Sequence, residues 1–294
     1  MTAVTAPAVS PPAAGRFGAR ACVIGWPVDH ARSPLIHGYW LDRTGLDGTY
    51  ERVAVAPNEI HAFLERFPES GYAGGNVTVP HKEAALAACD EVEPVARAIG
   101  AVNTLWVDGG KLYGTNTDAL GFLANLDETA PGWDKEPGPA LVLGAGGAAR
   151  AVVWALIQRG FRPKIANRNV ARAEDLVRTF GGGSEAYPWE ARQALLWDAR
   201  ILVNTTSLGM KGIGDIGLDL RGARGDALIT DIVYVPLVTD LLDLATSWGL
   251  RTVDGLGMLL HQAVPGFERW FGLRPSVDAG LRARIVADIE GRAL

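Results

Sequence analysis

The fold follows from one stretch of the sequence, Leu141-Val142-Leu143-Gly144-Ala145-Gly146-Gly147-Ala148-Ala149-Arg150. Its three consecutive apolar residues predict a strand buried on both faces, followed by the pattern G-x-G-x-x-A and a helical stretch at residues 151–159. In this pattern the first glycine permits a tight turn, the second lets a pyrophosphate approach the backbone, and the small Ala149 lets helix and strand pack closely. A glycine-rich turn without a ligand is the alternative. We predict that a dinucleotide binds at this glycine loop, residues 144–148.

The next predicted strand, at residues 164–166, indicates which dinucleotide binds. It ends in Asn167-Arg168-Asn169, and Arg172 follows one turn later. An NAD site usually carries Asp or Glu at this point to hold the ribose 2′-hydroxyl, whereas arginine forks match the oxygens of a 2′-phosphate. The lack of an acidic residue therefore favours NADP(H). The alternative is that Arg168 and Arg172 are ordinary solvated residues at a helix start.

Short strand patterns alternate with helical patterns on both sides of this loop, which predicts an α/β fold of parallel sheets covered by helices. The clearest break lies at residues 128–139, where three prolines and two glycines stop any helix. Because 294 residues suit two domains, we expect one domain before this break and another after it. Residues 255–294 are helical without a strand, and the pattern alone assigns them to neither domain.

Polar residues cluster behind predicted strands of the first half, at residues 25–34, 76–82, 100–104 and 114–118. In an open α/β sheet, the crevice beyond the carboxyl ends of the strands is the ligand site. Helix capping explains Ser33, Thr117 or Asp118 taken singly. It does not explain why Lys82 follows a strand end near so many short polar groups, so we expect a polar substrate site here.

Composition limits the classes of function. The net charge of −5, from 28 basic and 33 acidic residues, gives no support for a nucleic-acid or anionic-membrane partner. Two cysteines and five scattered histidines predict neither a disulfide framework nor a metal site. No apolar run reaches the ~18 residues of a membrane span. Residues 1–17 carry three prolines and no basic region ahead of their apolar part, so we interpret them as a disordered tail and expect a cytoplasmic protein.

Nine motifs lie between Gly25 and Ala263. In chain order they are G-W-P-V-D-H-A-R-S-P-L-I-H, N-V-T-V-P-H-K, G-A-V-N-T, N-T-D, G-A-G-G-A-A-R, N-R-N-V-A-R-A, N-T-T-S-L-G-M, D-I-V-Y-V-P and D-G-L-G-M-L-L-H-Q-A. Jointly they are very specific, and through them the chain closely resembles the shikimate dehydrogenase family. Members of that family reduce 3-dehydroshikimate to shikimate with NADPH, and some also act on quinate.

The resemblance implies the architecture. It implies a substrate-binding and catalytic domain at residues 18–127 plus 255–294, and a Rossmann-type NADP-binding domain at residues 128–254. The C-terminal helices then return to the first domain, which the pattern alone left open. We expect a small-molecule substrate in the cleft between the domains, and a monomer or homodimer.

The resemblance also implies roles for individual residues. Lys82 and Asp118 match the catalytic pair. The implied substrate contacts are Ser33, Thr78, Asn103, Tyr234 and Gln262. The cofactor wall adds Asn167, Arg168, Arg172, Thr206, Ser207, Ile232 and Gly255 to the glycine loop. These residue types suit ketone reduction, because a lysine in a cleft can supply and retrieve the proton while a nicotinamide supplies the hydride.

One position departs from the family's usual Ser-x-Ser before the proline, because its first serine is Ala31 here. A lost charge-assisted hydrogen bond is worth about 1.5–3 kcal/mol. Ala31 also leaves space beside the carbon that bears the carboxylate, where quinate carries an extra hydroxyl. Our hypothesis is that Ala31 weakens shikimate binding and admits quinate or a related substrate. The alternative is that Arg32, a water or a backbone N–H replaces the donor.

Two other functions stay open. One is an oxidoreductase for quinate or another cyclic hydroxy acid. The other is a relative that senses a metabolite without turnover, but a sensor need not keep Lys82 and Asp118.

Overall fold

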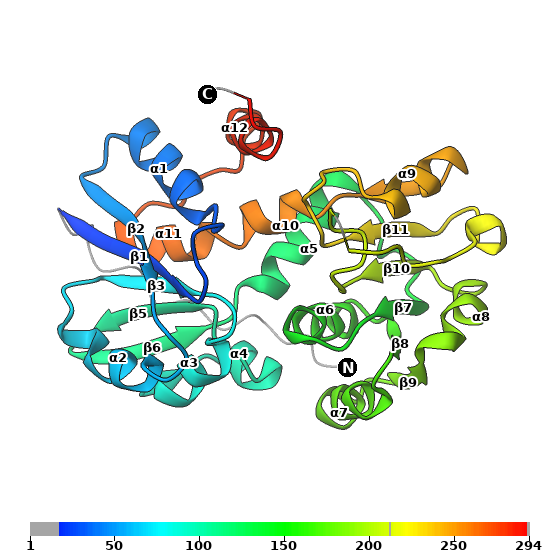
Figure 1. Cartoon of the computed structure of the whole chain (residues 1–294), viewed down its shortest axis with the longest axis horizontal. Coiled ribbons are helices and arrows are strands. Elements are labelled where there is room, and N and C mark those ends of the chain that lie inside the picture. The colour runs from blue at the N-terminus through cyan, green and yellow to red at the C-terminus, as the bar shows by residue number, and fades with distance from the viewer. Residues whose placement is uncertain (1–17, 212, 293–294) are drawn as a thin grey trace.

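The computed structural model describes residues 18–211 and 213–292, and the tail predicted at residues 1–17 lies outside them. The described chain forms two six-stranded sheets with helices packed on each, arranged side by side (Figure 1). This arrangement confirms the predicted α/β fold with two domains.

The first sheet has the strand order β2-β1-β3-β5-β6-β4. β5 runs antiparallel to both of its neighbours, whereas the other strand pairs are parallel. The prediction of parallel sheets is therefore wrong at β5 and holds for the other three strand pairs of this sheet. The strands are β1 (Ala19–Gly25), β2 (Gly48–Ala54), β3 (Gly74–Val77), β4 (Glu91–Val92), β5 (Thr104–Asp108) and β6 (Lys111–Thr115).

A two-residue turn causes this difference. Asp108 pairs with Lys111, so Gly109 and Gly110 alone connect β5 to β6. Their φ angles are 57° and 77°, and a hairpin turn with two positive φ angles favours glycine at both positions. The alternation of strands and helices concealed this hairpin because no helix separates its strands.

The second sheet is parallel throughout, with the order β12-β11-β10-β7-β8-β9. Counted outward from β7, this is the strand order of a Rossmann fold, whose connections change direction between β7 and β10. Leu141, Val142 and Leu143 of β7 are fully buried, as their apolar run predicts. The strands are β7 (Pro139–Leu143), β8 (Arg162–Asn167), β9 (Glu185–Pro188), β10 (Ile201–Asn204), β11 (Leu228–Asp231) and β12 (Arg251–Val253).

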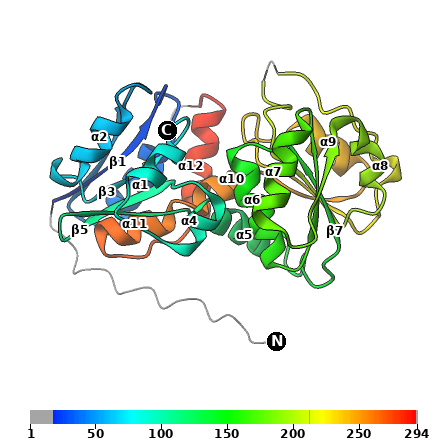
Figure 2. The ribbon, with the colours of Figure 1, turned by 90° about the horizontal axis from the view of Figure 1, so that it is seen from below.

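Helices cover both sheets (Figure 2). Those that connect strands of the first sheet are α1 (Ser33–Thr44), α2 (Ile60–Arg66), α3 (Lys82–Ala88) and α4 (Pro94–Ile99). Those of the second are α6 (Gly147–Gln158), α7 (Val170–Phe180), α8 (Arg192–Leu196) and α9 (Asp240–Ser247). Three short 3₁₀ turns complete the connections, at Phe67–Glu69, Trp189–Ala191 and Leu220–Gly222.

Two helices lie between the sheets, α5 (Asp118–Thr129) and α10 (Leu256–His261), and they pack against each other (Figure 1). After α10 the chain forms α11 (Val264–Phe271) and α12 (Ala279–Ile289). Phe267 and Trp270 of α11 share an apolar core with Ile36 and Trp40 of α1. The C-terminal helices therefore pack back on the first domain, while the exact domain limits stay a prediction.

Over residues 18–211 and 213–292, no helix is both long enough and apolar enough to cross a bilayer.

Candidate active site

A cavity of about 180 Å³ lies between the two halves of the molecule, at the carboxyl ends of strands in both sheets. The fold brings together here all of the residues predicted for catalysis and substrate binding, although they span more than two thirds of the chain. They are Ser33, Thr78, Lys82, Asn103, Asp118, Tyr234 and Gln262. Ile232 and Gly255, predicted for the cofactor, line the same cavity.

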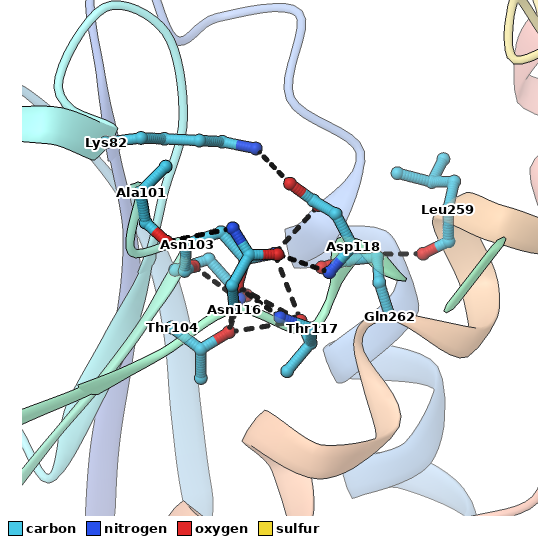
Figure 3. A network of polar contacts seen from close by, with 10 residues as sticks. Lys82, Ala101, Asn103, Thr104, Asn116, Thr117, Asp118, Leu259 and Gln262 are labelled. Carbon is cyan, nitrogen blue, oxygen red and sulfur yellow. Dashed lines mark hydrogen bonds and ion pairs between the residues drawn. The ribbon is translucent and has the colours of Figure 1, made fainter. Parts of the chain in front are cut away.

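Lys82 and Asp118 form an ion pair in this cavity (Figure 3). Each is the first residue of its helix, Lys82 of α3 and Asp118 of α5. Lys82 Nζ donates to Asp118 Oδ2 over 2.5 Å, and the exposed fractions of the two side chains are 24% and 12%. The ammonium keeps further N–H donors that can reach a ligand, because one bond uses only one of its three.

Asn103 fixes the orientation of the Asp118 carboxylate. Its Nδ2 donates to Asp118 Oδ1 over 2.8 Å and to Thr117 Oγ1 over 3.0 Å. Its Oδ1 accepts from the Thr117 backbone N–H over 2.8 Å and from Thr104 Oγ1 over 2.9 Å. These side chains are buried, so the network holds Asp118 Oδ1 in place while Lys82 binds Oδ2.

Capping does not account for the polar helix starts. At the N-cap positions of α1 and α5, Arg32 and Thr117 make no capping hydrogen bond through their side chains. Ser33 is buried and lines the cavity instead, and Asp118 bonds to Lys82 and Asn103. The functional interpretation of these residues therefore has geometric support that the capping alternative lacks.

A buried carboxylate organises the loop that carries Tyr234. Asp231 Oδ1 accepts from Asn204 Nδ2 and from the Val233 N–H, each over 2.9 Å, and Oδ2 accepts from Thr239 Oγ1 over 2.8 Å. Asp231, Asn204 and Thr239 are fully buried. Burial raises the pKa of Asp231, although its three hydrogen bonds oppose the shift.

The same network shapes the loop after β10. Asn204 Oδ1 accepts from the backbone N–H and the hydroxyl of Thr206, over 3.0 and 2.8 Å, and Asn204 Nδ2 also donates to Leu208 O. A single buried pair, Asn204 and Asp231, therefore holds both loops. One loop carries Thr206 and Ser207, and the other carries Ile232 and Tyr234.

The glycine loop has the shape that a phosphate group requires. Gly144 has a φ of +102°, and a Cβ there would lie 2.9 Å from Thr205 Oγ1, so this turn favours glycine. Around Gly146 and Gly147 no atom lies within 4 Å of where a Cβ would be. α6 begins at Gly147 without a capping side chain, so its first backbone N–H groups are open to an anion.

A hollow of about 390 Å³ adjoins this loop and is lined by Ala145, Gly146, Gly147 and Arg172. Arg150 and Arg178 line it too, although neither was predicted as a site residue. Arg150 is the last residue of the G-A-G-G-A-A-R motif, so the motif could have indicated this position. The remaining cofactor candidates line neither the cavity between the domains nor this hollow, so their roles stay predictions. They are Gly144, Ala148, Asn167, Arg168, Thr206 and Ser207.

Asn76, Met258 and Leu259 also line the cavity, and the sequence analysis gave them no role. Asn76 opens N-V-T-V-P-H-K, and Met258 lies in D-G-L-G-M, so both belong to quoted motifs. A larger hollow of about 780 Å³, beside the end of α12, contains none of the predicted site residues. The described residues contain no group of His, Cys, Asp and Glu that could hold a metal ion.

The fold and the cavity define a two-domain α/β protein with a Rossmann-type second domain and a Lys–Asp pair in its interdomain cavity. Three family profiles match the chain. Residues 23–105 match the shikimate dehydrogenase substrate binding domain, residues 134–213 match shikimate / quinate 5-dehydrogenase, and residues 255–283 match the shikimate 5′-dehydrogenase C-terminal domain.

Individual proteins agree with these profiles. The chain is 58% identical over 274 residues to the shikimate dehydrogenase (NADP(+)) of Azorhizobium caulinodans, covering 93% of this chain and 98% of that one. The crystal structure of shikimate 5-dehydrogenase from Thermus thermophilus, in complex with NADP(H) and shikimate, has a TM-score of 0.80 and 39% identity over 90% of this chain and 98% of that one. Quinate dehydrogenase from Corynebacterium glutamicum, in complex with NAD, has a TM-score of 0.84 and 30% identity over 92% and 99%. The chain belongs to the shikimate dehydrogenase family.

Proposed function

We propose that this protein is an NADP-dependent oxidoreductase that interconverts 3-dehydroshikimate and shikimate. The observation that carries the proposal is the Lys82–Asp118 pair, held by Asn103 in a small cavity between a substrate domain and a Rossmann domain. Relatives named for this activity cover almost the whole chain.

Lys82 is the proposed proton donor and acceptor. When NADPH is bound, its nicotinamide supplies the hydride that adds to the carbonyl carbon. The Lys82 ammonium gives a proton from Nζ to the carbonyl oxygen, which becomes the hydroxyl, and it recovers the proton from water. In the reverse direction the neutral amine takes that proton back. Asp118 positions the ammonium and can accept a hydrogen bond from a neighbouring substrate hydroxyl.

The other cavity side chains suit a polyhydroxylated acid. Ser33 can donate to a carboxylate, and Thr78 can bond a ring hydroxyl. Asn103 can bond one as well when its Nδ2 exchanges the hydrogen bond to Thr117 Oγ1 for one to the substrate. Tyr234 and Gln262 close the cavity from the second half of the chain. A site that pairs each hydroxyl discriminates strongly against analogues that lack one, because its own polar groups are then left unpaired.

NADP(H) fits the second half of the site. The open N–H groups at the start of α6 and the room at Gly146 and Gly147 suit a pyrophosphate. Arg168 and Arg172, both exposed near the start of α7, are proposed to hold the 2′-phosphate. Asn167, Thr206, Ser207, Ile232 and Gly255 complete the proposed cofactor wall.

A substrate panel tests the proposal. Purified protein is given shikimate, quinate or aminoshikimate with NADP⁺ or NAD⁺, and reduced cofactor is followed by its absorbance. We expect the highest kcat/KM for shikimate with NADP⁺. Quinate is the second candidate substrate, because Ala31 leaves out a side-chain hydroxyl. No reduction of NADP⁺ with any of the three acids would contradict the proposal and favour a sensor.

We also expect a monomer or homodimer in the cytoplasm without a nucleic-acid partner. Light scattering of the purified protein measures the first property, and a larger assembly would contradict it.

A further inference from the structure

The cavity presents no net charge to its ligand. Among the described residues that line it, Lys82 and Asp118 are the only charged ones, and their ion pair cancels. The cyclic hydroxy acid of the proposed function is an anion, and a carboxylate removed from water needs a cation or several hydrogen-bond donors. Ala31 withholds one donor, so a cation just beyond the cavity wall would supply the complementary charge.

Arg32 lies at that boundary. It directly precedes Ser33, which lines the cavity, and its Cζ lies 5.8 Å from the ring centroid of Tyr234, which also lines it. Arg32 Nε donates to Asp288 Oδ2 of α12 over 2.8 Å, and 20% of the arginine side chain is exposed. Among the described residues, this is the one hydrogen-bond partner of the guanidinium, which leaves its two Nη groups available to a ligand.

Another arginine near Ala31 is already engaged. Arg52 donates through both Nε and Nη2 to the backbone oxygen of Ala31, over 3.1 and 2.7 Å, on the exposed side of that loop. Its guanidinium group is therefore already bound to the backbone. Arg32, in contrast, sits at the N-cap position of α1, where the positive end of the helix dipole adds to its charge.

We propose that Arg32 recognises the carboxylate of the substrate and is a specificity-determining residue of this site, in place of the hydroxyl that Ala31 lacks. Asp288 holds the guanidinium through Nε, which leaves the Nη groups to bind the acid beside Ser33 and Tyr234. The inference rests on the proposed function, since it names how that site selects an anionic ring.

The test pairs a residue change with a substrate change. Arg32→Gln is assayed with shikimate and with its methyl ester, which keeps the ring hydroxyls but lacks the charge. We expect KM for shikimate to rise about 10- to 100-fold, as the loss of a charge-assisted hydrogen bond predicts, with KM for the ester and for NADP⁺ within twofold of the unchanged protein. Equal effects on acid and ester, or no effect on either, would overturn the inference.

Two further variants separate recognition from a structural role. Arg20→Gln removes one positive charge from the same domain, from the exposed Arg20–Glu51 ion pair, and should leave KM for shikimate within twofold. Asp288→Asn removes the negative charge but keeps an amide oxygen that can accept from Arg32 Nε, so the guanidinium stays in place and KM for shikimate should stay or fall. A rise in Asp288→Asn as large as that in Arg32→Gln would show that Arg32 acts only by anchoring α12, and would contradict the inference. Failure of the proposed function is distinct, because the unchanged protein would then not oxidise shikimate.

Discussion

Position 31 is where a single residue separates this chain from the usual pattern of its family. Ala31 has no hydroxyl, and its backbone oxygen is held by Arg52. When Arg32 binds the carboxylate, as proposed, the lost hydroxyl of Ala31 no longer matters for carboxylate binding. What Ala31 still provides is space beside the carbon that bears this carboxylate. That space is where quinate differs from shikimate by one hydroxyl.

Restoring the serine should narrow the specificity. In Ala31→Ser, the ratio of kcat/KM for shikimate to that for quinate should rise at least about fivefold, because overfilling a packed site costs about 1–3 kcal/mol. Steady-state kinetics with both acids measures the ratio. An unchanged ratio would mean that Ala31 has no part in substrate choice.

We propose that the cofactor preference resides in Arg168 and Arg172. Replacing both Arg168 and Arg172 by glutamine removes two guanidinium groups that match a phosphate. We expect KM for NADP⁺ to rise about tenfold or more while KM for NAD⁺ stays within twofold, because NAD lacks the 2′-phosphate. If both values rise equally, the arginines support the fold of α7 and do not select the cofactor.

At the scale of elements, the loops after β10 and β11 depend on buried Asp231. Asp231→Ala leaves Asn204 Nδ2, the Val233 N–H and Thr239 without their acceptor. We expect the free energy of unfolding to fall by about 1–3 kcal/mol and KM for shikimate to rise, because the Tyr234 loop loses its anchor. Thermal unfolding and kinetics test this, and a variant with unchanged stability and KM would contradict it.

Asp231→Asn is the matched control, and its effect should depend on pH. Burial raises the folded-state pKa of Asp231 above 3.8, so the native state holds its proton more tightly than the unfolded chain. The wild-type contribution is therefore fully present below 3.8 and is lost as pH rises through the folded pKa. The stability of Asp231→Asn relative to wild type should be higher at pH 7 than at pH 4. The opposite trend in denaturant unfolding would refute the burial argument.

Sequence patterns predicted the helices and strands better than they predicted which strands pair with each other. The buried run 141–143 and the glycine loop were unambiguous, because a doubly covered strand and a phosphate turn each need particular residues. The β5–β6 hairpin was missed, because the prediction relied on strands that alternate with helices and no helix separates β5 from β6. Arg150 and Asn76 were quoted within motifs yet given no role, since a motif does not reveal which of its side chains face a hollow.

At the scale of the whole molecule, the two halves meet where α5 crosses α10. A Cβ on Gly257 would lie 1.8 Å from Asn125 Oδ1, and Asn125 Nδ2 donates to the Asp254 backbone oxygen over 2.8 Å. The close approach of the helices therefore requires glycine at 257. No periodicity predicts such a contact, because it joins segments more than 120 residues apart.

Gly257→Ala should therefore destabilise the protein by about 1–3 kcal/mol and lower its melting temperature by several degrees. Gly38→Ala is the control, since Gly38 lies in α1 with nothing within 4 Å of a Cβ. There, alanine should stabilise by up to about 1 kcal/mol through helix propensity. Melting temperatures that move in the same direction for both variants would contradict the packing argument.

The Lys82–Asp118 pair depends on single residues, on helices and on both domains. Each residue begins a helix of the first domain, and the second domain closes the cavity around them. The most direct measurement is the turnover of Lys82→Ala with shikimate and NADP⁺, together with its affinity for NADP⁺. We expect kcat to fall at least about 100-fold while the NADP⁺ dissociation constant stays within twofold. A Lys82→Ala protein that keeps most of its kcat would contradict the assignment of Lys82 as the proton donor.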